Sequence, residues 1–188
     1  LKGFISASGS NYYGAQTTAK VFKESDAVGT DFLGQVCQKW EAAANQFRDL
    51  NIPVTILRTG VVLSKTGGAL EKMRTPIVSP LGSGNQYMAW IHIDDLCNLY
   101  IKAVEENFVG VYNTVSPEFH TSKTFSKALA KAIKRLFLPI AVPGFLLKLV
   151  FGELAIILLH GSRLSSDKLE KKGFVFKYKE LKRALESL

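Results

Sequence analysis

Short apolar runs alternate along the chain with longer segments whose apolar positions recur at helical spacing. The short runs cover residues 3–8, 52–58, 86–91 and 110–116. The helical segments cover residues 31–50, 95–106 and 125–136. Strands that alternate with helices of ten or more residues favour an α/β fold with parallel pairing, in which sites form where the strands end.

Residues 31–50 carry an apolar stripe at helical spacing. It consists of Phe32, Val36, Trp40, Ala43, Phe47 and Leu50. Thr30 or Asp31 is expected to cap this helix. Asp94 or Asp95 is expected to cap the helix over 95–106, and Thr121 or Ser122 the one that follows.

The C-terminal third predicts a strand over FLPIAV, a helix over 143–160, a short helix closed by Gly173, a strand over 174–178 and a last helix. The apolar stretch 136–159 is long enough by count to span a bilayer. Its two prolines, Lys148 and Glu153 disfavour a membrane span, because a charge at mid-depth costs a few kcal/mol. A strand followed by a buried helix that Pro143 opens explains the same residues, so no membrane is expected.

Composition narrows the class further. Hydrophobic residues make up 47% of the chain, which excludes a disordered protein. The two cysteines, Cys37 and Cys97, both fall in predicted helices, so a disulfide framework is not expected and a reducing, cytoplasmic compartment fits best. The chain opens Leu-Lys-Gly-Phe-Ile with no initiator methionine, which is typical of a fragment.

Charge leaves two interpretations open. The net charge of +8 is concentrated near the end, in KLEKKGFVFKYKELKR. A nucleic-acid surface is one interpretation. A solvated helix surface is favoured, because glutamates alternate with the lysines and no aromatic platform is interleaved.

His92 and Asp94 lie two residues apart and could supply two metal ligands from one side of a strand. A metal site needs three or four ligands, and His120 and His160 have no ligand-like spacing. A helix cap and one histidine hydrogen bond explain the pair more simply, so no metal is expected.

Five motifs in order carry a resemblance: SASGSNYYG, WEAAA, ILRTGVVL, PLGSGNQYMAWIHIDDL and VYNTVSP. Together they resemble the second half of an extended short-chain dehydrogenase/reductase. More narrowly, the chain is similar to the NAD(P)-dependent epimerase/dehydratase subgroup with an extra C-terminal domain. The resemblance implies the C-terminal part of a doubly wound, Rossmann-like parallel sheet over 1–116 and a small α/β substrate-side domain over 117–188.

The same resemblance places the Gly-rich dinucleotide fingerprint upstream of residue 1. Gly67-Gly68 lacks its spacing. NADP (or NAD) is therefore the expected cofactor, held tightly only with the missing N-terminal half of the same protein. Ser6 and the turn Thr59-Gly60-Val61 are expected to line it, since a glycine lets the backbone approach a flat ring.

Catalytic positions depart from the family pattern. The resemblance puts Ser8 at the position that orients a substrate, but Leu33 and Cys37 where the family has its proton-transferring Tyr and its Lys. Leu has no proton to transfer, and a buried Cys keeps a high pKa. Tyr12 or Tyr13, in the loop after the strand, could substitute or could pack over the pocket mouth.

The substrate side departs as well. In nucleotide-sugar members a strand Arg clamps the diphosphate, and here that position is Met88. Gln86 and the loop before it can still hydrogen-bond a ligand. A less charged small molecule is therefore the expected substrate.

Two functions stay open. One is a nucleoside-diphosphate-sugar epimerase-like oxidoreductase of unknown substrate with atypical catalysis. The alternative is a non-catalytic NADP-binding regulatory protein that lost its base. The helix over 31–50 matches one that the family uses for pairing, so a homodimer is also expected.

Overall fold

The computed structural model describes the backbone of residues 1–188 and every side chain except that of Leu154. Its central sheet has three parallel strands in the order β1 (Phe4–Gly9), β3 (Val54–Thr59) and β7 (Gly110–Thr114). Gly9 pairs with Thr59, and Thr59 pairs with Thr114, so the three strands end at one edge. The α/β class with parallel strands is confirmed.

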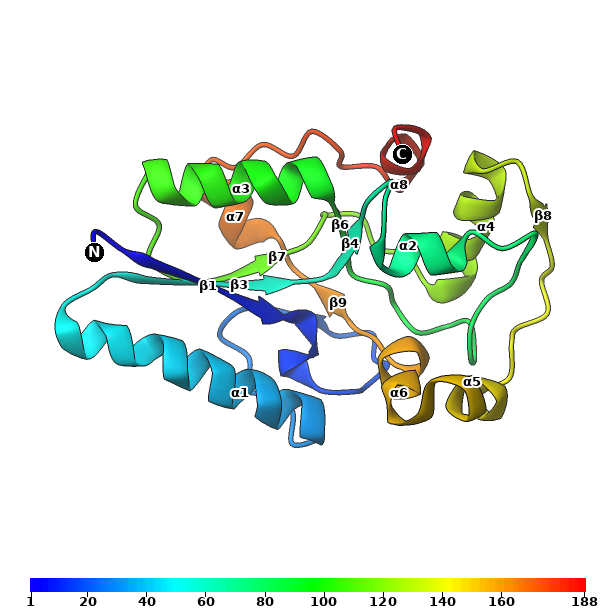
Figure 1. Cartoon of the computed structure of the whole chain (residues 1–188), viewed down its shortest axis with the longest axis horizontal. Helices are drawn as coiled ribbons and strands as arrows, with labels where there is room; N and C mark the ends of the chain where they lie inside the picture. The colour runs from blue at the N-terminus through cyan, green and yellow to red at the C-terminus, as the bar shows by residue number, and fades with distance from the viewer.

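Helices cover both faces of this sheet, as Figure 1 shows: α1 (Phe32–Asn45) lies on one face and α3 (Ile93–Glu105) on the other. Strand alternation explains the division. Ile56 packs with Ala44 of α1, whereas the next residue, Leu57, packs with Leu99 of α3. All four of these side chains are buried.

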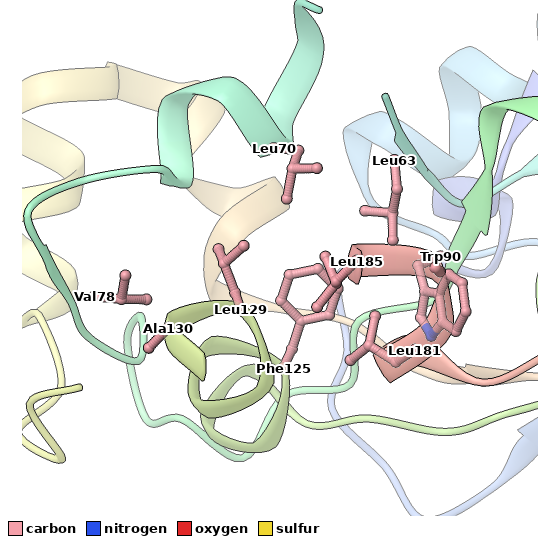
Figure 2. Close-up of a cluster of buried hydrophobic side chains, with 10 residues drawn as sticks. Leu63, Leu70, Val78, Trp90, Phe125, Leu129, Ala130, Leu181 and Leu185 are labelled. Atoms are coloured by element: carbon pink, nitrogen blue, oxygen red, sulfur yellow. The ribbon is translucent and has the colours of Figure 1, made fainter. Parts of the chain in front are cut away.

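A second core lies beside the sheet and is drawn in Figure 2. It joins β4 (Val61–Leu63), α2 (Gly68–Met73), β5 (Ile77–Val78), β6 (Trp90–His92), α4 (Ser122–Ala132) and α8 (Leu181–Glu186). Trp90 from β6 and Phe125 from α4 are both fully buried in it. The cluster contains residues from both sides of residue 116. The domain boundary expected there stays a prediction.

The remaining elements are short. They are η1 (Ser10–Tyr13), β2 (Val21–Phe22), η2 (Gln46–Leu50), β8 (Leu136–Phe137), α5 (Gly144–Phe151), η3 (Gly152–Leu154), α6 (Ala155–Leu159), β9 (Arg163–Leu164) and α7 (Asp167–Lys171). The single helix predicted over 143–160 is wrong. It breaks at Gly152, whose φ of 57° is left-handed and ends α5.

Two capping predictions are confirmed and one is wrong. Asp31 accepts from the Gly34 N–H at the start of α1, and Thr121 caps α4 with a capping box. At α3 the cap is His92, whose Nδ1 accepts the N–H of Asp94 at 3.0 Å. Neither aspartate caps the helix. The Asp95 carboxylate has another hydrogen-bond partner.

That partner explains why the strand predicted over 174–178 is wrong. The Asp95 carboxylate accepts the N–H groups of Lys177 at 2.7 Å and Tyr178 at 2.9 Å. A buried side chain therefore takes backbone bonds that a neighbouring strand would otherwise make. Phe174 and Phe176 still bury their rings, as the alternation predicts.

Most of the apolar stripe predicted over 31–50 faces outward, with the exception of Phe47, whose ring stacks on Phe4. Phe32 is 76% exposed, Trp40 53% and Leu50 69%. The buried face of α1 instead consists of Gly34, Cys37, Glu41 and Ala44. Hydrophobic periodicity found the helix but assigned its inner face wrongly. Across the described part of the chain, no helix has the length and apolar character to cross a membrane.

Candidate functional site at the ends of the parallel strands

The carboxyl edge of the sheet is where sites form in parallel α/β proteins. Immediately beyond β3, Gly60 donates its N–H to the Thr114 carbonyl at 3.3 Å. A Cβ at Gly60 would lie 2.6 Å from the Ala89 carbonyl oxygen and 3.0 Å from Val115 Cγ1. Only glycine fits this crossing of two backbones.

Arg58, near the end of β3, is fully paired. Its Nε and Nη2 donate to the two carboxylate oxygens of Glu41, both at 2.8 Å. The two side chains are 3% and 7% exposed. Burial would lower the pKa of Arg58, but the hydrogen bonds that it donates to Glu41 and Tyr13 outweigh this effect and raise that pKa. This bidentate pair fastens α1 to the sheet.

Ser8 belongs to the same network. Its hydroxyl donates to Glu41 Oε1 at 2.7 Å, and its side chain is buried. Cys37, one helical turn before Glu41, is also buried, and burial raises the pKa of its thiol. Ser6 donates to the Ala7 carbonyl at 3.1 Å. A catalytic role for Ser8 stays a prediction, and its hydroxyl would have to leave Glu41 to orient a carbonyl.

The two loop tyrosines sit differently. Tyr13 donates to Asn113 Oδ1 at 2.6 Å and accepts from Arg58 Nη1 at 2.9 Å. Burial, only partly offset by Arg58, raises the pKa of Tyr13 to about 12. Tyr12 is half-buried and stacks its ring on the Arg58 guanidinium, 3.3 Å from Cζ to the ring centre. Tyr13 is therefore a protonated structural hydroxyl in this state.

A narrow hollow opens beside the Gly60 turn, at the end of β7. Its walls include Tyr87, Met88, Ser116, Phe119, His120, Ser162 and Arg163. The enclosed room is about 10 Å³, roughly the space that one water molecule needs. Ala89 and Val115, the two residues that crowd Gly60, also line it.

The predicted substrate residues reach this region unequally. Met88 lines the hollow. The Gln86 amide is 1% exposed and donates to the carbonyls of Leu81 at 2.9 Å and Leu158 at 2.8 Å. Gln86 thus closes the loop on α6 and has no free donor for a ligand.

The predicted cofactor turn is held by local bonds. Thr59 Oγ1 donates to the Leu57 carbonyl at 3.2 Å, and the Val61 N–H donates to Ala89 at 2.8 Å. The structure places Gly60 and Met88 at the hollow, and Ser8 and Tyr13 in the Arg58 network. The apolar cluster of Tyr13, Phe22, Val115 and Leu164, with Tyr12 and Ala89 against it, joins the two groups.

Sequence reasoning missed Glu41 and Arg163. Glu41 could have been found, because a carboxylate one turn after Cys37 shares the helix face that meets the Arg58 strand. Arg163 stands alone in HGSRLSS with no periodic signal. Over the residues whose side chains are described, no group of three His, Cys, Asp or Glu residues could hold a metal ion.

The fold is of the α/β class, with parallel sheets and a glycine turn at the ends of the strands. Residues 142–188 match the family described as a domain of unknown function, DUF1731. The "epimerase family protein SDR39U1 homolog, chloroplastic" of Arabidopsis thaliana is 38% identical over 98% of this chain and 54% of its own length.

Solved structures agree. The human epimerase family protein SDR39U1, crystallised with NADPH, superimposes with a TM-score of 0.89 at 31% identity, over 99% of this chain and 64% of the human one. A nucleoside-diphosphate sugar epimerase from Corynebacterium glutamicum matches with a TM-score of 0.78 at 28% identity, over 98% of this chain and 37% of that chain. Over nearly its whole length the chain is thus similar to the SDR39U1-type epimerase family proteins. It spans between about half and two thirds of the length of the curated relatives it matches.

Proposed function

We propose that this chain is the C-terminal part of an NADP-dependent oxidoreductase of the epimerase/dehydratase type, acting on a small hydroxyl or keto compound. The observation that carries the proposal is the convergence of the glycine turn after β3, the end of β7 and a walled hollow at one sheet edge. The human relative crystallised with NADPH supports the choice of cofactor. A doubly wound sheet, completed by strands beside the free edge of β1, belongs to the same proposal.

In this function the Thr59-Gly60-Val61 turn, whose glycine packs closely against Ala89 and Val115, would lie beside the nicotinamide. The bound cofactor would supply a hydride for the substrate carbonyl carbon, and this chain would supply the proton for the carbonyl oxygen. Tyr12 is our choice of proton donor, because the Tyr13 hydroxyl is committed to Asn113 and Arg58. Ser8 orients the carbonyl only if it exchanges Glu41 for the substrate.

The test uses the complete protein. NADPH binding is followed by fluorescence, and NADPH oxidation by absorbance over a panel of small ketones, aldehydes and keto acids. Tyr12→Phe should lower turnover by about 100-fold or more, the usual contribution of a general acid, while NADPH binding is kept. Turnover that is unchanged in Tyr12→Phe would remove Tyr12 from the mechanism. Failure to bind NADPH would end the proposal.

A non-catalytic NADP-binding regulator is the second candidate. The side chains of Leu33 and Cys37 favour it, since neither can perform the family's proton transfer, and burial raises the pKa of Cys37. Tight NADPH binding without oxidation on any substrate of the panel would select this function over the first.

We also propose that two copies pair through the outward face of α1. Phe32, Val36 and Trp40 form an apolar stripe there, and large exposed stripes of this kind mark interaction surfaces. Trp40→Lys should convert a dimer to a monomer in analytical ultracentrifugation. A wild-type protein that sediments as a monomer at every concentration would refute the pairing.

A further inference from the structure

The wall of the hollow beside Gly60 includes Arg163, a cation without a paired anion among the described residues. Arg163 is partly buried at the start of β9, and within the described residues its Nε atom is shielded from solvent and has no hydrogen-bond partner. None of the ion pairs among those residues includes it. A guanidinium nitrogen that is shielded from water and has no acceptor is an unfavourable arrangement for the protein alone.

Aromatic rings hold this guanidinium in place. Its Cζ lies 5.0 Å from the centre of the Tyr87 ring and 5.6 Å from that of Phe119. Rings at such distances attract a cation and restrict where its planar fork can point, without using its N–H donors. Arg163 is thereby oriented while its hydrogen-bonding capacity is left free.

The acid that lines the same hollow does not pair with Arg163. Glu118 lines the same hollow, but its Oε2 accepts the Leu181 N–H at 2.5 Å and lies 3.0 Å from His120 Nε2. The hydroxyls of Ser116 and Ser162 donate to backbone carbonyls of Lys179 and Gln16. With both hydroxyl donors committed, Arg163 supplies a free donor for a ligand in the hollow.

The hollow also adjoins the predicted nicotinamide position. Ala89 and Val115 form a wall shared by the hollow and the Gly60 turn. A group bound at Arg163 would therefore lie across this shared wall from the Gly60 turn. This arrangement suits a substrate anchored at one end and reduced at the other.

Resting on the function proposed above, we propose that Arg163 binds a carboxylate of the substrate, so that the substrate class is a small hydroxy or keto acid. One planar guanidinium matches one planar carboxylate in shape and in charge. A phosphate would carry up to two negative charges and prefer a further cation, and the hollow's lining supplies no second Lys or Arg.

The experiment is a titration of the complete protein without any dinucleotide, followed by the Nε–Hε signals of its arginines in ¹⁵N NMR. Sodium acetate and sodium pyruvate are the probes, and inorganic phosphate at matched ionic strength is the comparison. The Arg163 signal should shift saturably with the carboxylates, with a dissociation constant in the millimolar range usual for so small a ligand. Phosphate should bind at least about tenfold more weakly.

Variants distinguish a specific binding site at Arg163 from a general effect of positive charge. Arg163→Gln should abolish saturable binding, and Arg163→Lys should weaken it about tenfold, because the charge stays but the fork is lost. Arg183→Gln, on the exposed face of α8, is the matched control and should bind like the wild type. Absence of a saturable shift, tighter binding of phosphate, or full binding by Arg163→Gln would overturn the proposal. Because no dinucleotide is present, these outcomes are independent of whether NADPH binds.

Discussion

Two arginines lie at the same edge of the fold, and their environments are opposite. Arg58 gives three nitrogens to protein acceptors, including both oxygens of Glu41, and carries the Tyr12 ring on its face. Arg163 is also framed by aromatic rings, but its Nε has no acceptor among the described residues. Aromatic rings thus stack on Arg58, whose nitrogens have acceptors, and also on Arg163, whose Nε has none. The difference assigns Arg58 to the architecture and Arg163 to a ligand.

The largest expected effect comes from breaking the ion pair between Arg58 and Glu41. Arg58→Leu leaves the Glu41 carboxylate buried without a counter-charge, so the free energy of unfolding should fall by about 3–5 kcal/mol. Chemical denaturation measures it. The double variant Arg58→Leu/Glu41→Leu should be more stable than the sum of the two single losses by about 1–3 kcal/mol. Strictly additive losses would show that the pair does not act as a unit.

A second effect concerns Tyr13, which joins Arg58 to Asn113. Its pKa rises from 10.0 to about 12 on folding, so the folded state favours the protonated phenol. The resulting stabilisation is complete below pH 10 and is lost as the pH rises from 10 toward 12, by roughly 2–3 kcal/mol.

Tyr13→Phe isolates this contribution from the lysines that titrate in the same range. The variant should be less stable at neutral pH by about 1–3 kcal/mol, because Asn113 Oδ1 loses its donor. The gap between variant and wild type should close above pH 10. Parallel unfolding curves across that range would contradict the raised pKa.

The comparison also shows what could be predicted from the sequence. β1, β3 and β7 could be, because each is a short, mainly apolar segment between helical segments, as expected of buried parallel strands. The inner face of α1 could not, since it carries Glu41 and Cys37 while the apolar residues face outward. Periodicity locates an apolar face but does not say what covers it.

For the site, the Gly60 turn was predictable from a glycine directly after a buried strand. The commitments of Gln86 and Tyr13 to Leu158 and Asn113 were not, because they join residues 72 and 100 positions apart. Arg163 was equally hidden. Arg163 is of interest because its Nε lacks a hydrogen-bond partner, and only the three-dimensional structure shows this.

The smallest expected effect is the one that tests the comparison most directly. Arg163→Leu, matched to Arg58→Leu, loses an aromatic contact worth about 0.5–1 kcal/mol and also removes a poorly solvated charge. The two terms oppose each other, so the free energy of unfolding should change by less than about 1 kcal/mol in the same denaturation assay. Saturating carboxylate should stabilise the wild type but not this variant, since only the former binds it in the folded state. A loss comparable to that of Arg58→Leu would mean that Arg163 already has a structural role, and the two arginines would then differ only in the partners they use.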